Sequence, residues 1–359
     1  MLSKLWKRQA PQMVGIDIGS HEIKAILLSK TADGYKIQNY AAVPVRKGAV
    51  VDHDIRDTEA VLESLRKIKH GLPKSLKFSA VAVSGSAVMT KVIYMDTTLN
   101  EEEMEAQIEI EADNLIPYSL DEVSIDFERV GPNITDPSKV DVLLSACRTE
   151  NIDSRVDALD TVELEVKVID VEAYALGRSA ELIYDQLPKG AKQKSIAMVD
   201  VGANMTTFAV VENGETTFIR EQAFGGELFT QSILSFYGMP HDEAERAKVT
   251  GQLPRNYLFE VLSPFQLQLL QQIKRTLQIY CTASGHEKID YIVLCGGTAK
   301  LEGMVELLHK ELGTHTVIAD PFQGCLHAEA GVKSQLQSTM SKYMVACGLA
   351  LRSYAQWRT

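Results

Sequence analysis

The sequence predicts an α/β protein with two similar domains and a small α+β unit inserted into the first. The chain has 359 residues, more than twice the roughly 150 of an average domain, which favours two cores. Two apolar segments, GIDIGS at 15–20 and VDVGAN at 199–204, end in the same Asp-x-Gly turn and lead into a second strand. Between them, residues 92–128 hold twelve Asp and Glu and neither Lys nor Arg. This break in composition indicates an insertion.

The composition limits the classes of function. With 45% hydrophobic and 24% charged residues, the chain is typical of a globular protein. A formal net charge of −11 argues against binding to nucleic acid or directly to an anionic membrane. No apolar run reaches the roughly 18 residues of a membrane-spanning helix, and five cysteines without a CxxC pair indicate reduced thiols. We expect a cytoplasmic protein whose N-terminal leader is frayed or touches a bilayer through Leu2, Leu5 and Trp6.

The first half of the chain contains the elements of one domain and of the insertion. We expect a strand hairpin at 13–30, a helix from Thr58 as N-cap to Gly71, and a buried strand with a small-residue turn at 79–88. In the insertion, a helix begins at Asn100 and ends before Pro117, and strands follow at 123–130 and 140–148. The expected boundaries are 1–90 for the first part of domain 1 and 91–165 for the insertion.

The second half repeats the opening pattern. A short strand and a helix at 166–187 precede the polar spacer PKGAKQKS, so residues 166–193 connect domain 1 to domain 2, which spans 194–340. Domain 2 begins with three strands that include an Asn213-Gly214 hairpin turn, and continues with helices over 227–285 and a glycine-rich turn near 296. Residues 341–359 are expected to return to domain 1 as one apolar helix.

The duplicated turns predict a phosphate site. Small residues let backbone N–H groups approach phosphate oxygens, and the candidates are Gly19, Ser20, Gly202, Ala203 and Asn204. Asp17 and Asp200 stand two residues before each glycine, where carboxylates can hold a hydrated Mg²⁺. One Asp-x-Gly turn alone is common in ordinary β-turns, but two in the same frame favour a nucleotide site.

Weaker signals surround this pair of turns. Gly296 and Gly297 precede a predicted helix, where backbone can lie against a nucleoside. Glu227, Glu245 and Lys248 either contact the nucleoside or form a solvated helix face. The chain has no GxxxxGK[ST] segment, which excludes a P-loop mechanism.

These turns, in this order, resemble the phosphate 1, connect 1, phosphate 2, adenosine and connect 2 segments of the superfamily of actin, sugar kinases and heat-shock chaperone ATPases. The resemblance implies an actin-like (ribonuclease H-like) fold that binds ATP or ADP with Mg²⁺ between its domains. Asp17 and Asp200 match the two Mg²⁺-linked aspartates, and Glu172 matches the connect 1 glutamate, although Ala173 replaces the usual proline. Glu172 either orients a hydrolytic water or has no catalytic role, and we expect weak or no ATPase activity. The implied cofactor-binding set also contains His21, Lys24, Thr206, Gly225, Gly226, Thr298 and Lys300.

The insertion is similar to that of the FtsA and PilM families, and the segment NLIPYSLDEVSIDF at 114–127 is most like PilM. That resemblance implies a type IV pilus component, peripheral at the inner membrane, that docks the N-terminal cytoplasmic peptide of PilN and contacts the pilus ATPases; self-association is possible. An FtsA-like divisome protein is the alternative, but it would carry a C-terminal amphipathic helix after a linker. A small-molecule kinase would need a further acidic base in the cleft, and no segment supplies one.

The acidic insertion predicts a partner surface. Twelve carboxylates without a basic residue repel one another, and a basic, apolar peptide would relieve this repulsion; a merely soluble acidic face is the plainer explanation. We expect the peptide to enter a groove between the insertion and domain 1. The residues predicted to bind it are Leu115, Ile116, Pro117, Tyr118, Asp121 and Glu122.

Overall fold

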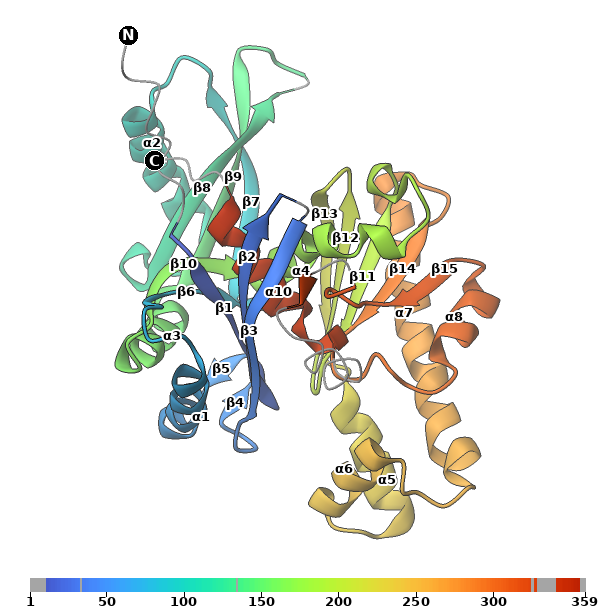
Figure 1. Ribbon diagram of the computed structural model, residues 1–359. Coiled ribbons are helices and arrows are strands. Elements are labelled where there is room, and N and C mark those ends of the chain that lie inside the picture. Colours follow the sequence, from blue (N-terminus) through green and yellow to red (C-terminus); the bar gives the residue numbers. More distant parts are fainter. Residues whose placement is uncertain (1–10, 33, 134, 324–325, 328–339, 356–359) are drawn as a thin grey trace.

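Two β-sheets with the same strand order form the body of the molecule. The computed structural model describes residues 11–32, 34–133, 135–323, 326–327 and 340–355 (Figure 1). The leader at 1–10 and the residues after 355 lie outside the described residues. The domain boundaries expected from the sequence stay predictions.

The first sheet has the order β10-β6-β1-β2-β3-β16. Its strands are β1 (Met13–Ile18), β2 (Glu22–Thr31), β3 (Gly34–Pro44), β6 (Phe78–Val83), β10 (Glu165–Val171) and β16 (Leu326–His327). Strands β1, β2 and β3 are antiparallel neighbours, whereas β6 and β10 run parallel to β1. All six residues of β1 are buried, as expected for a central strand that is covered on both faces.

The second sheet repeats this plan in the order β13-β12-β11-β14-β15. Its strands are β11 (Ile196–Val201), β12 (Thr206–Glu212), β13 (Glu215–Gln222), β14 (Tyr291–Cys295) and β15 (His315–Ile318). Again three antiparallel strands are followed by two parallel ones. The predicted hairpin turn joins β12 to β13 with φ of 53° at Asn213 and 86° at Gly214, the backbone of a two-residue turn with both φ positive. The predicted duplication is confirmed.

The acidic insertion contains a three-stranded sheet and one helix. Strands β7 (Val88–Asp96), β9 (Lys139–Arg148) and β8 (Val123–Pro132) pair in that order, and α2 (Glu101–Leu115) packs on the sheet through Met104, Ile108 and Ala112. Asn100 and Glu103 form the capping box that starts α2. The helix start predicted at Asn100 is therefore confirmed.

Helices cover the outer faces of both sheets. In the first half, α1 (Thr58–Gly71) and α3 (Thr149–Thr161) share a core with β1 and β2. The N-cap of α1 is Asp57, whose side chain accepts from the Ala60 N–H; the prediction of Thr58 was wrong by one residue. In the second half, the helices are α5 (Gly226–Tyr237), α6 (His241–Thr250), α7 (Ser263–Ser284) and α8 (Met304–Leu312), with a π-turn at Leu258–Leu262 before α7.

Two short helices fill the space between the sheets (Figure 1). They are α4 (Glu172–Arg178), which follows β10 and continues into 3-10 turns, and α10 (Met344–Ala350). A 3-10 turn stands on each side of α10, so its segment does not form the one apolar helix that was predicted for residues 341–359. Glycine allows their close contact, because a Cβ on Gly348 would overlap the Ala175 carbonyl and one on Gly15 would overlap the Ala346 carbonyl. One core joins both helices to both sheets. This core fixes the distance between β1 and β11, the strands that lead into the predicted phosphate turns.

The described part of the chain has no helix that is long and apolar enough to cross a bilayer.

Candidate functional site

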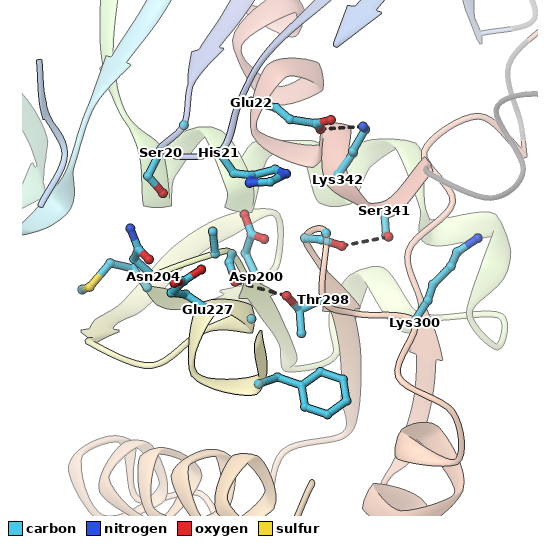
Figure 2. A pocket seen from close by; sticks show the side chains of 18 of the residues that line it. Ser20, His21, Glu22, Asp200, Asn204, Glu227, Thr298, Lys300, Ser341 and Lys342 are labelled. Atoms are coloured by element: carbon cyan, nitrogen blue, oxygen red, sulfur yellow. Dashed lines mark hydrogen bonds and ion pairs between the residues drawn. The ribbon is translucent and has the colours of Figure 1, made fainter. Parts of the chain in front are cut away.

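A cavity of about 600 Å³ lies where β1 and β11 end, and both halves of the molecule line it. Figure 2 shows side chains from both halves converging on this space, among them Ser20 and His21 from one half and Asp200, Asn204 and Thr298 from the other. The two Asp-x-Gly turns face each other across the cavity. The residues of both turns therefore line one cavity, and the binding of a nucleotide there stays a prediction.

The two turns have the same backbone hydrogen bond. The Gly19 N–H donates to the Glu22 carbonyl at 3.2 Å, and the Gly202 N–H donates to the Met205 carbonyl at 2.9 Å. In each turn the aspartate pairs with a residue on the next strand: Asp17 opposite Lys24, and Asp200 opposite Thr207. The two carboxylates thus occupy equivalent places in the duplicated fold.

Charge distinguishes the first turn. Lys24 Nζ donates to Asp17 Oδ2 at 2.9 Å, and both side chains are largely buried. Burial opposes the charged form of Lys24, but the carboxylates around it, Asp17 first, raise its pKa overall. Lys24 therefore stays protonated and supplies a fixed positive charge beside the first turn.

The second turn has no such cation. No described residue forms a hydrogen bond or an ion pair with the Asp200 carboxylate, and burial raises the pKa of Asp200 to about 7 although the Lys24 charge opposes the rise. No group of three or more His, Cys, Asp and Glu side chains suited to a metal occurs among the described residues. A cation here would rely on the two aspartates, water and its ligand, as Mg²⁺ commonly does.

A third turn closes against Asp200. Gly296 has φ of 89°, and a Cβ there would overlap the Asp200 carboxylate and the Val201 carbonyl, so only glycine fits. Ser341 holds this turn from the other side, since its hydroxyl donates to the Gly296 carbonyl at 3.0 Å. Thr298 ties it to the second phosphate turn by donating to the Gly202 carbonyl at 3.2 Å. The dashed lines of Figure 2 mark both contacts.

The rest of the lining mixes charged and apolar side chains. Charged side chains come from β1, β2, β11 and the start of α4, and also from α5 and α6. On α6, the Lys248 ammonium contacts the Glu245 carboxylate at 2.6 Å and the Thr230 hydroxyl of α5 at 2.8 Å. The larger apolar residues of α5, α6 and the segment around the π-turn are Phe229, Val249, Leu253, Tyr257 and Leu262; Val50, Met205, Leu301 and Val345 complete the apolar lining.

An ion pair at the start of α4 was missed by the sequence analysis. His53 Nδ1 lies 3.3 Å from Glu172 Oε2, and both residues line the cavity. Burial opposes the charged imidazole, but the hydrogen bond and charge of Glu172 raise the pKa of His53 to about 9. Burial likewise opposes ionised Glu172, and the contact with His53 holds its pKa below the usual range. Another missed pair, Lys342 with Glu22 at 2.6 Å, also borders the cavity.

Two residues of the predicted cofactor set do not line the cavity. Thr206 is fully buried and donates to the Phe224 carbonyl at 2.7 Å, while Gly225 packs on the Ala203 backbone, where a Cβ would overlap it. Both support the second turn without facing the cavity. The predicted residues that line it are Asp17, Gly19, Ser20, His21, Lys24, Glu172, Asp200, Gly202, Ala203, Asn204, Gly226, Glu227, Glu245, Lys248, Gly296, Gly297, Thr298 and Lys300.

A second cavity of about 540 Å³ lies between the insertion and the first sheet's domain. We call it the groove; its lining residues are Asp52, Asp54, Ser86, Ala87, Val88, Met89, Ile116, Pro117, Tyr118, Val123, Ala146, Cys147, Arg148, Glu150 and Asn151. Three of the predicted partner residues, Ile116, Pro117 and Tyr118, are among them.

The other predicted partner residues lie elsewhere. Leu115 packs at the edge of the insertion's core, and Asp121 and Glu122 are exposed outside the groove. The acidic side chains that line the groove come instead from the β4–β5 turn region, formed by β4 (Val50–Val51) and β5 (Asp54–Ile55), and from α3. Sequence distance explains the miss, because these residues are brought to the insertion only by folding.

Comparison with known proteins identifies the family. The family model described as type IV pilus assembly protein PilM matches residues 15–354. The cell division protein FtsA of Bacillus subtilis (strain 168) is 25% identical over 354 residues, covering 86% of this chain and 78% of FtsA. FtsA of Pseudomonas aeruginosa is 22% identical and covers 82% of this chain and 79% of its own length.

Two solved structures share the fold. The structure of a PilM–PilN type IV pilus biogenesis complex has a TM-score of 0.79 at 22% identity, over 96% of this chain and 99% of that one. The ethanolamine utilization protein EutJ from Carboxydothermus hydrogenoformans has a TM-score of 0.57 at 16% identity, over 96% and 90% of the two chains. The predicted actin-like fold is thereby confirmed. With the family model matched along nearly its whole length, the chain belongs to the PilM family of type IV pilus assembly proteins.

Proposed function

We propose that this protein is an ATP-binding scaffold of the type IV pilus machine, with the nucleotide in the cavity between the two sheets. The observation that carries the nucleotide site is Asp200, a half-buried carboxylate of the cavity lining that has no hydrogen-bond or ion-pair partner among the described residues and whose pKa is raised to about 7 by desolvation. It faces an equivalent turn that has its own cation, Lys24. Such an arrangement is costly unless a further cation enters with the ligand.

The residues fit Mg²⁺ with ATP or ADP. The backbones of the turns at Gly19–Ser20 and Gly202–Asn204 would hold the phosphates, and Asp17 and Asp200 would hold Mg²⁺ through water. When bound, Mg²⁺ neutralises phosphate charge. The apolar lining around α5 and α6 suits the base, and Glu245 and Lys248 suit the ribose.

Slow turnover is part of the proposal. Glu172 is the residue that the superfamily resemblance offers for orienting a hydrolytic water, but its carboxylate is engaged by His53 at 3.3 Å. An ionised and paired carboxylate is a weak general base. In this proposal the bound nucleotide contributes to assembly of the pilus machine through binding and not through its hydrolysis.

The groove is the proposed docking site for the N-terminal cytoplasmic peptide of PilN, and through it the protein would reach the inner membrane and the pilus ATPases. Three acidic side chains, Asp52, Asp54 and Glu150, line it with one basic residue, Arg148. Arg148 lies 4.5 Å from the centre of the Tyr118 ring. An apolar floor with acidic margins suits a basic, apolar peptide.

A peptide titration tests the docking site. Labelled PilN N-terminal peptide is titrated against wild type, Tyr118→Ala and the control Tyr94→Ala, whose exposed ring lies on β7 of the same insertion outside the groove. We expect Tyr118→Ala to weaken binding by more than about 1 kcal/mol and Tyr94→Ala to leave it unchanged. Equal affinity for all three proteins would place the peptide elsewhere.

The acidic residues give a second comparison at low and high salt. Neutralising Asp52 and Asp54, which line the groove, should slow association and reduce its salt dependence more than neutralising Asp121 and Glu122, which do not. A larger effect from neutralising Asp121 and Glu122 would instead place the binding site at the acidic segment that the sequence predicted.

A further inference from the structure

The turn between β4 and β5 places a histidine in the cavity. Val50 pairs with Ile55 and Val51 with Asp54, so Asp52 and His53 are the two turn residues. Both have positive φ, 48° and 66°, the conformation of a tight two-residue hairpin turn. The histidine side chain is therefore held at the tip of a short, rigid hairpin.

A buried arginine fixes this tip from behind. Arg155, on α3, is 2% exposed and donates to the His53 carbonyl, to the Ala82 carbonyl at 3.0 Å and to the Asn151 carbonyl at 2.8 Å. Burying a guanidinium costs free energy, and here hydrogen bonds to three backbone carbonyls, one of them in the turn, offset that cost. The position of His53 is thus built into the fold.

The two ring nitrogens of His53 have different surroundings. Nδ1 contacts the Glu172 carboxylate at 3.3 Å, whereas Nε2 is buried and has no hydrogen-bond partner among the described residues. With the pKa of His53 raised to about 9 by Glu172 against the effect of burial, the ring is cationic at neutral pH. A cationic imidazole whose Nε2–H has no hydrogen-bond acceptor among the described residues is suited to bind an anion.

The place of His53 in the cavity indicates which anion. It lies near Asp17 and Glu172 on the wall that the first half of the chain supplies, whereas the apolar side chains of α5, α6 and the π-turn come from the second half. A nucleotide whose base lies in the apolar part and whose phosphates follow the two turns would bring its outermost phosphate nearest to this wall.

We infer that His53 is a specificity-determining residue of the cleft: when a nucleoside triphosphate binds, the ring turns so that Nε2 reaches the cavity and donates to the terminal phosphate, which makes the protein prefer ATP to ADP. The inference rests on the proposed nucleotide site and adds the discrimination between the two nucleotides. The plainer alternative is a positioning residue that only orients Glu172 through Nδ1.

His53→Asn separates these two roles. Asn tolerates positive φ and keeps a short amide that can hydrogen-bond to Glu172, but it has no group at the position of Nε2. The matched control is His70→Asn, the same substitution at an exposed histidine of α1 that lines neither the cavity nor the groove.

The experiment measures the affinities of the full chain for ADP and for the non-hydrolysable analogue AMP-PNP, with Mg²⁺, by calorimetric titration. We expect wild type to favour AMP-PNP, and His53→Asn to lose roughly tenfold in AMP-PNP affinity, the size of one charge-assisted hydrogen bond. ADP affinity should change less than about twofold, and His70→Asn should behave as wild type.

The outcomes separate the inference from the proposed function. Failure of wild type to bind either nucleotide contradicts the nucleotide site itself. If wild type binds both nucleotides and His53→Asn has the same ratio of AMP-PNP affinity to ADP affinity as wild type, the proposed role of His53 is wrong. The proposed nucleotide site is not contradicted by that result. A melting curve without nucleotide checks that each variant folds. Where His53→Asn does not fold, His53→Gln replaces it in the test. Its longer amide should retain part of the preference for AMP-PNP over ADP, and an unchanged preference would contradict the role of His53.

Discussion

The two phosphate turns are equivalent in backbone and different in charge. Each closes with the same hydrogen bond from the glycine N–H, and each carries its aspartate at the same place on the preceding strand. Opposite Asp17 the next strand places Lys24, and opposite Asp200 it places Thr207. One carboxylate therefore has an internal cation, and the other does not.

This difference teaches how a duplicated fold becomes an asymmetric site. Desolvation raises the pKa of both carboxylates, but Lys24 lies against Asp17 and opposes the rise there, whereas Asp200 has no ion pair with any described residue and its pKa is raised to about 7. A ligand that brings its own cation would relieve the second turn. The cleft is thus built to bind a metal–anion complex and not a bare anion.

The largest expected effect comes from removing each carboxylate in turn without nucleotide. Asp17→Asn should lower the free energy of unfolding by about 3 kcal/mol, because Lys24 would remain buried without its ion-pair partner. Asp200→Asn should not destabilise the protein and should raise its stability, since it removes a carboxylate that has no ion-pair partner among the described residues and whose charged form is disfavoured by desolvation. Denaturant unfolding at pH 8 measures both, and equal losses would show that the turns do not differ.

The pH dependence of stability sharpens the same contrast. The pKa of Asp200 is about 7 in the folded protein against 3.8 ordinarily, so the folded state holds this proton more tightly than the unfolded state. Its contribution to stability is present below about pH 4 and is lost as the pH rises to about 7. We expect wild type to lose about 2 kcal/mol more than Asp200→Asn over this interval, allowing for water in the cleft. Parallel pH curves would contradict the raised pKa.

Making the second turn resemble the first is a direct test of the asymmetry. Thr207→Lys places an ammonium opposite Asp200, as Lys24 stands opposite Asp17. The ratio of ATP affinities with and without Mg²⁺ should fall by roughly tenfold, about 1.4 kcal/mol, because the side chain takes the place of the cation. Thr207→Met, which adds bulk without charge, is the control and should keep its dependence on Mg²⁺.

The smallest expected effect concerns hydrolysis. Phosphate release by the isolated chain should be slow, and Glu172→Gln should change it less than about twofold, since the carboxylate is already engaged by His53. A steady-state phosphate assay measures this. Brisk release that depends on Glu172 would instead indicate an active ATPase.

Local patterns were sufficient to predict the central strands of both sheets and the start of α2, because apolar strands and a capping box depend on adjacent residues, whereas β3, β7 and β15 were not predicted. The α1 cap was misplaced because Asp57 and Thr58 can both cap, and nothing local decides between them. The last apolar segment was expected to be one helix, but it is broken into three short pieces. Its central piece is fixed by the contact of Gly348 with Ala175, which depends on residues far apart in the sequence.

The same reasoning explains which site residues could be predicted. The Asp-x-Gly turns were predictable because the same pattern occurs twice in the sequence, and nearly all residues near the two turns line the cavity. His53 carried no such signal, since an Asp-His pair in a two-residue turn becomes chemically informative only when Arg155 and Glu172 are folded around it. The acidic side chains of the groove were missed for the same reason.

The measurement that tests the central claim most directly is the melting temperature with and without Mg-ATP. At about 100 times its dissociation constant, a ligand adds roughly 2.7 kcal/mol to stability, so Mg-ATP should raise the melting temperature of wild type clearly. Asp17→Ala and Asp200→Ala, each compared with its own melting temperature without nucleotide, should lose most of that rise. Absence of a shift in wild type with Mg²⁺ present, or full retention of the shift by both variants, would contradict the account of the cleft.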